Sequence, residues 1–122
     1  MTTEVQIGAC VFRLSASADA GRWMSHAVLA DTSERFGVEC TGATEAEAID
    51  RLLRWLRWQH DHTEALRVLQ EREREYYRTV AASAFAVPSD DLLIVAQRNA
   101  SLDQVDAARR RLDEVRASRP GE

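Results

Sequence analysis

The sequence predicts an α+β protein: a three-stranded antiparallel sheet followed by a long helix and a C-terminal helical hairpin. Strand-like alternation runs through the N-terminal third, no proline or glycine occurs between Glu45 and Pro88, and capping signals recur near the C-terminus. We therefore predict a β-β-β-α domain over 1–60, a helical extension over 61–118 and a disordered tail over 119–122.

The three predicted strands cover residues 5–14, 22–30 and 36–41. The small, polar segment 15–21 is predicted to turn between the first two strands, which makes them a hairpin. Residues 31–35 supply a polar connection to the third strand. The expected result is a meander.

The long helix is predicted over 45–86, and its start is marked by a capping box. In such a box the Thr44 hydroxyl accepts from a free backbone amide, and the Glu47 carboxylate reaches back to the cap. A break near His62 is the main alternative to one continuous helix. Ion pairs are expected along its outer face. The pairs are Glu47–Arg51, Asp50–Arg54 and Arg67–Glu71.

After Pro88, the apolar run 92–96 predicts either a short helix or a strand, because periodicity does not separate the two over so few residues. Residues 99–101 are predicted to end it. Ser101 and Gln104 have the spacing of a second capping box, so a last helix is expected from Leu102. That helix is expected to fold back on the long one.

Composition limits the function classes. The net charge of −4 disfavours a general polyanion binder, and the sixteen cations are all arginine, which excludes a lysine Schiff base or a phosphate loop with its lysine. The N-terminus has neither the basic nor the apolar region of a secretory signal, so a cytoplasmic protein is expected. Cys10 and Cys40 lack the spacing of a zinc or redox motif, which favours buried free thiols.

The stretch 51–62, Arg-Leu-Leu-Arg-Trp-Leu-Arg-Trp-Gln-His-Asp-His, crowds arginine, tryptophan and histidine into one helix. His60 and His62 point about 200° apart on a helix, so they are not expected to hold one metal ion, and no cofactor is predicted. The apolar stripe favours a partner-binding surface, with Trp55 more buried than Trp58. The predicted partner-binding residues are Leu52, Trp55, Leu56, Trp58, His62, Leu66, Leu69, Tyr76 and Tyr77.

The alternative hypothesis is nucleic-acid binding by the basic run Arg109, Arg110 and Arg111. Aspartate and glutamate flank this run, which favours a solvated helix face. Catalysis is not expected: Ser25 and His26 are adjacent in a predicted strand and point to opposite faces, and no nucleophile motif occurs.

The segment 19–52, with Asp19-Ala-Gly-Arg-Trp and the later Gly42-Ala-Thr-Glu-Ala-Glu-Ala, resembles the HicB-like antitoxin domain. In that family an Asp-Gly-aromatic hairpin precedes a Gly-x-Thr-x-x-Glu-Ala helix start. The Pro-Asp-Leu-Pro-Gly-Cys segment usual in the family is missing, and residues 31–37 occupy its place. The resemblance implies a non-catalytic, protein-binding domain, sometimes with a separate DNA-binding element.

Together these observations predict a non-catalytic protein-interaction module, acting as a homo-oligomer or as an accessory or scaffold subunit of a larger complex. At least a dimer is expected, because the helical stripe exceeds what a small sheet covers. The alternative is a HicB-like antitoxin or transcriptional regulator that binds a small toxin and DNA.

Overall fold

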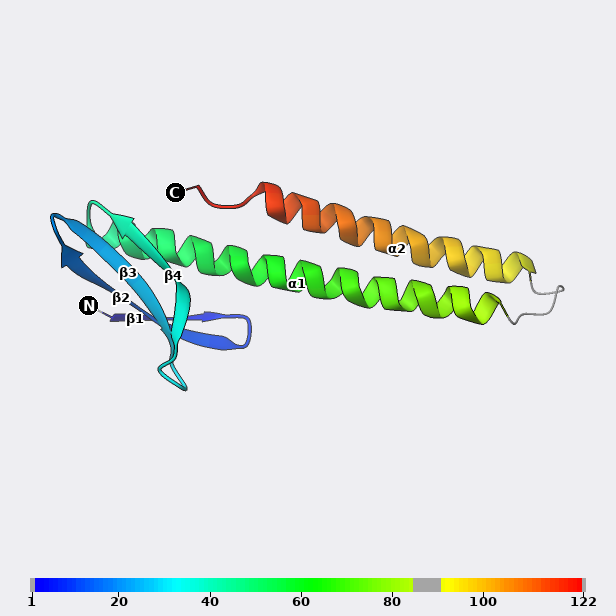
Figure 1. Cartoon of the computed structure of the whole chain (residues 1–122), viewed down its shortest axis with the longest axis horizontal. Helices are drawn as coiled ribbons and strands as arrows, with labels where there is room; N and C mark the ends of the chain where they lie inside the picture. The colour runs from blue at the N-terminus through cyan, green and yellow to red at the C-terminus, as the bar shows by residue number, and fades with distance from the viewer. Residues whose placement is uncertain (1, 85–90, 122) are drawn as a thin grey trace. The chain divides into compact units, whose positions relative to one another are not determined.

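The computed structural model describes residues 2–84 and 91–121 and has an α+β fold (Figure 1). Its elements are β1 (Thr2–Ile7), β2 (Cys10–Asp19), β3 (Arg22–Leu29), β4 (Arg35–Gly42), α1 (Glu45–Ser83) and α2 (Asp91–Ala117). The contacts divide the chain into two compact units. Among described residues, unit 1 comprises 2–60 and 119–121, and unit 2 comprises 61–84 and 91–118, so α1 contributes to both.

Unit 1 contains an antiparallel sheet of four strands in the order β1-β2-β3-β4, rather than the three strands predicted. The predicted first strand, 5–14, is interrupted at Gly8, where φ is +62° and Ile7 pairs with Cys10 across a tight turn. Glycine adopts this left-handed conformation without a steric penalty, so the two residues Gly8 and Ala9 suffice to reverse the chain.

The second turn is also shorter than predicted. Strand β2 continues through the small residues 15–19, and the reversal takes place at Ala20 and Gly21, both with positive φ. Small polar residues are common in turns, but here cross-strand pairing with β3 keeps them extended.

One face of the sheet packs on the first part of α1 and forms the core of unit 1. Side chains alternate along the strands, so every second residue faces the helix. The buried apolar cluster comprises Ile7, Phe12, Leu14, Ala27, Cys40, Leu52 and Leu56. Ser25 is fully buried among them, and its hydroxyl lies 2.7 Å from the Ala48 carbonyl oxygen and 3.1 Å from that of Cys40. This hydroxyl links β3 to β4 and to α1.

The start of α1 confirms the predicted Thr44 cap, whereas the return bond from Glu47 goes to the residue before the cap. The Thr44 hydroxyl accepts from the Glu47 amide at 3.1 Å, and the Glu47 carboxylate accepts from the Ala43 amide at 3.3 Å. A Cβ added at Gly42 would lie 2.6 Å from the Ala48 nitrogen, so this glycine allows the strand to approach the helix closely. The helix then runs unbroken to Ser83, without the break considered near His62; residues 85–86 of the prediction lie outside the described part.

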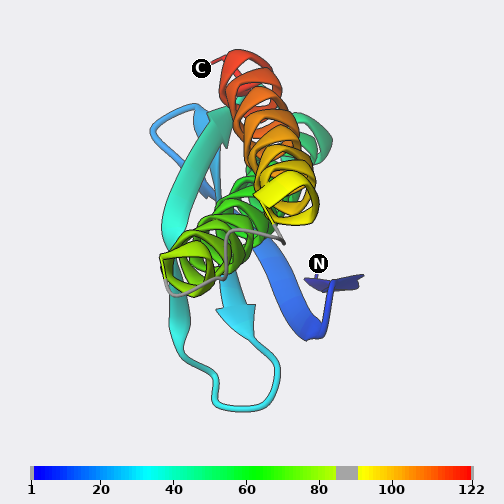
Figure 2. The same ribbon diagram turned by 90° about the vertical axis from the view of Figure 1, so that its right-hand side faces the viewer.

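Unit 2 is an antiparallel pair made by the second part of α1 and by α2, which lie side by side in Figures 1 and 2. Its buried residues are Ala65, Leu69, Ser101, Val105, Ala108, Leu112 and Val115. On α2 they recur at alternating intervals of four and three, the spacing of a helix-helix seam.

The predicted C-terminal helical hairpin is matched only in part: the region is helical, but α2 is a single helix, so the end predicted at residues 99–101 is wrong. Residues 99–101 contain neither proline nor glycine, and the buried seam continues through Ser101. Ser101 is therefore an interior residue rather than a cap, and its buried hydroxyl has no hydrogen-bond partner within the described part of the chain.

Candidate functional site

Two tryptophans and an arginine form an aromatic–cation cluster in unit 1. Trp55 and Trp58 are neighbours on α1 because residues three apart share a helix face. Their ring centroids are 5.7 Å apart at an interplanar angle of 80°, an edge-to-face arrangement. The Arg119 guanidinium carbon lies 5.1 Å from the Trp55 centroid and 5.8 Å from the Trp58 centroid. Both distances are within the range of cation–π attraction.

A groove of about 580 Å³ adjoins this cluster, between β4 and α1, and we call it the tail groove. Its lining comprises Val38, Glu39, Cys40, Thr41, Arg51, Trp55, Gln59, Arg119 and Gly121. Arg51 is engaged, since it donates to the Thr41 carbonyl at 2.9 Å and lies 2.7 Å from the Glu47 carboxylate. The Gln59 side-chain oxygen is buried without a hydrogen-bond partner in the described residues.

Cys40 lines the same groove and has a buried thiol. Burial raises the pKa of this thiol, and the nearby positive charge of Arg51 opposes the shift. A raised pKa keeps the sulfur protonated and weakly nucleophilic. Cys10 is exposed, so the prediction of two buried thiols is correct only for Cys40, although both cysteines are free.

The predicted partner-binding residues divide between the two units. In unit 1, Leu52 and Leu56 are covered by the chain's own sheet and leave no surface for a partner. Trp55 and Trp58 are partly buried, and Trp55 packs against the core.

In unit 2, Leu69 lies in the seam, whereas Tyr77 is 63% exposed. His62, Leu66 and Tyr76 are partly buried. Only the exposed and partly buried members of the set have surface left for a partner.

The described residues contain no group of three or more metal-ligating side chains. The His60 ring lies against the β1–β2 turn, since a Cβ added at Gly8 would be 2.5 Å from its Cε1 atom. His60 is thus an exposed residue whose ring contacts this turn.

The three arginines predicted as a nucleic-acid surface are exposed. They are Arg109, Arg110 and Arg111. The Arg111 guanidinium lies 4.0 Å from the Glu114 carboxylate. Along α1 the predicted pairs Glu47–Arg51, Asp50–Arg54 and Arg67–Glu71 are confirmed at 2.7, 2.9 and 2.6 Å. These acids offset the positive charge that binding to phosphates needs.

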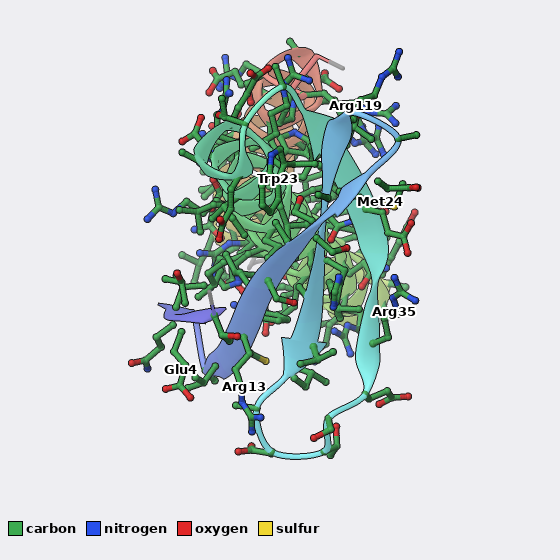
Figure 3. All side chains as sticks on the ribbon, turned by 90° about the vertical axis from the view of Figure 1, so that its left-hand side faces the viewer. Glu4, Arg13, Trp23, Met24, Arg35 and Arg119 are labelled. Carbon is green, nitrogen blue, oxygen red and sulfur yellow. The ribbon has the colours of Figure 1, made fainter. Side chains whose placement is uncertain are left out.

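The face of the sheet away from α1 carries polar side chains (Figure 3). Arg13 lies 3.8 Å from Glu4, and the Ser15 hydroxyl lies 2.9 Å from His26 Nε2. Ser25 is beside His26 in the sequence, but the cross-strand register brings Ser15 opposite His26, and the sequence alone does not show this pairing. Glu39 is the next residue in this row, but its carboxylate pairs with Arg35. No triad is therefore assembled here.

Two features of the molecule were missed from the sequence. Leu92, Leu93 and Val95 are 88%, 63% and 41% exposed, although their apolar run was visible as a signal. Arg119 was placed in a disordered tail, and no local signal marks its contact with residues more than sixty positions earlier.

No protein-family model matches the chain, and no curated protein and no solved structure matches it significantly. Over the described ranges 2–84 and 91–121, no helix has the length and apolar character needed to cross a membrane.

Proposed function

We propose that this protein is a non-catalytic protein-interaction module that associates with a second copy of itself through unit 2. The observation that carries the proposal is the uncovered start of α2. No described side chain from 92 to 100 is buried, yet Leu92, Leu93 and Val95 are large and apolar. Single exposed apolar residues are ordinary, but several together on one helix end characterise an interface.

A second copy suits this surface for two reasons. Two helices packed side by side cover only one stripe of each other, and pairing two such hairpins into a bundle covers the remaining apolar positions. The polar surface of unit 2 also carries both signs of charge in close succession, including Glu71, Arg72, Arg74, Glu75 and Arg78. Such a surface meets its own copy without net repulsion.

Light scattering across a dilution series tests the proposal. We expect a mass of at least twice the 13.7 kDa monomer at high micromolar concentration. Replacing Leu92 or Leu93 by glutamate should raise the dissociation constant about tenfold or more, since each buried leucine contributes roughly 1.5–3 kcal/mol.

Ala107→Glu is the matched control, because it adds the same charge at an exposed position of the same helix. A monomer at every concentration would refute the proposal. Equal effects of Ala107→Glu and Leu92→Glu would show that the added charge, and not the lost apolar side chain, causes dissociation.

An antitoxin-like regulator is the second candidate, favoured by the exposure of Arg109, Arg110 and Arg111 and by the resemblance over 19–52. It predicts DNA binding that weakens steeply with salt and is lost in Arg109→Ala/Arg110→Ala. It also predicts copurification with a small toxin. A larger protein recovered instead would favour the accessory-subunit form of the first proposal.

A further inference from the structure

The aromatic–cation cluster of unit 1 has no part in the self-association proposed above. Its cation comes from Arg119, two residues beyond the end of α2, in a segment that contains Pro120 and Gly121. Arg119 is exposed, and its guanidinium lies over the two tryptophan rings. A cation–π contact at an exposed site is weak, so another ligand of the same chemistry can displace it.

The tail groove supplies further acceptors for such a ligand. Gln59 contributes a buried oxygen that lacks a partner in the described chain, and Glu39 adds negative charge to the lining, although its carboxylate also pairs with Arg35. The Arg51 guanidinium is already engaged by Thr41 and Glu47. A guanidinium has five N–H donors and a flat face that stacks on aromatic rings, so it matches this combination better than an ammonium group.

We propose that Trp55, Trp58 and the tail groove form a binding site for an arginine-bearing peptide segment of a partner protein. Arg119 occupies this site within the same chain and competes with the partner. A competitor in the same chain lowers the fraction of protein that is ready to bind, so the apparent dissociation constant of an external ligand rises by the inverse of that fraction. Removing Arg119 should therefore strengthen binding about three- to tenfold.

The test uses the full chain and a peptide with the sequence Ala-Ser-Arg-Pro-Gly, which repeats residues 117–121. Its control replaces arginine by citrulline, which has nearly the same shape and no charge. The readout is the NMR shift of the tryptophan indole N–H groups, with Trp23 as the internal reference. We expect the arginine peptide to shift the Trp55 and Trp58 signals of Arg119→Ala, and to bind several-fold more weakly to the unchanged protein.

Arg116→Ala is the matched control variant, because it removes an arginine of the same C-terminal region and leaves Arg119 in place. It should bind the peptide as the unchanged protein does. Trp58→Leu should abolish peptide binding and Trp58→Phe should weaken it, with the Trp23 signal confirming that unit 1 is folded. Equal binding of the arginine and citrulline peptides would overturn the proposal. Equal affinity of Arg119→Ala and the unchanged protein would overturn the competition by Arg119.

Discussion

Unit 1 covers its part of α1 with a sheet, whereas unit 2 covers its part with a single helix. The unit 1 core includes large side chains such as Phe12, Leu14 and Leu52, which are at most 5% exposed. The unit 2 seam includes Ala65, Ala108 and Ser101, and the start of α2 has no buried side chain among the described ones.

This difference suggests different sources of stability. A sheet face is broad enough to bury one helix, so unit 1 has the apolar contacts of a self-sufficient core. Two helices alone leave apolar positions in water, so unit 2 would gain stability from association. The predictions below compare the two environments, from the largest expected effect to the smallest.

The largest effect is expected for Leu52→Ala in unit 1, where the side chain is fully buried against the sheet. Truncation removes apolar contacts and leaves a cavity, so the free energy of unfolding should fall by about 2–5 kcal/mol. Urea denaturation followed by circular dichroism measures this loss.

Leu92→Ala, at an 88% exposed position of unit 2, is the comparison variant. At low micromolar concentration it should change stability by less than about 0.5 kcal/mol. A loss for Leu92→Ala as large as that for Leu52→Ala would mean that the start of α2 is covered in the monomer.

The predictions that the structure confirms rest on interactions between residues close together in the sequence. Thr44 and Glu47 cap α1 because their side chains reach amides within one turn, and the charge spacing placed its ion pairs. The signals that failed depended on tertiary context. The strand predicted over 5–14 ran across the turn at Gly8, and Ser101 had the spacing of a cap although it lies in a buried seam.

The candidate site was less predictable than the fold. The helical pattern predicted Trp55 and Trp58 as partner-binding residues, but it indicated neither Arg119 nor the β4 side of the tail groove. Those contacts join segments far apart in the chain. Likewise, the pairing of Ser15 with His26 follows from strand register, which depends on a turn two residues long.

A smaller effect is expected from the two buried serines, one in each unit. The Ser25 hydroxyl is shared between two carbonyl oxygens, so Ser25→Ala removes the buried hydrogen bonding that links β3 to β4 and to α1 and should cost about 0.5–1.5 kcal/mol. The Ser101 hydroxyl has no partner in the described chain, and alanine is the better helix former.

Ser101→Ala should therefore leave stability unchanged or raise it by up to about 1 kcal/mol. Thermal unfolding of both variants beside the unchanged protein checks the contrast. A clear loss for Ser101→Ala would show that its hydroxyl is hydrogen-bonded after all, and that the seam of unit 2 is as well satisfied as the core of unit 1.

The smallest effect is expected from alkaline pH and should arise in unit 1, through Cys40. Burial raises the pKa of this thiol in the folded protein above its value in the unfolded chain. Below the unfolded value both states keep the proton, so the thiol's contribution is fully present. As the pH rises past the unfolded value towards the folded one, the unfolded state loses its proton first, and the contribution declines.

Urea midpoints at successive pH values, compared with those of Cys40→Ala, isolate this decline, because the variant keeps every other titrating group. Cys10→Ala is the matched control and should follow the unchanged protein, since its thiol is exposed in the folded state. If the midpoints of Cys40→Ala fell with pH as steeply as those of the unchanged protein, the alkaline loss would have to come from groups other than the Cys40 thiol.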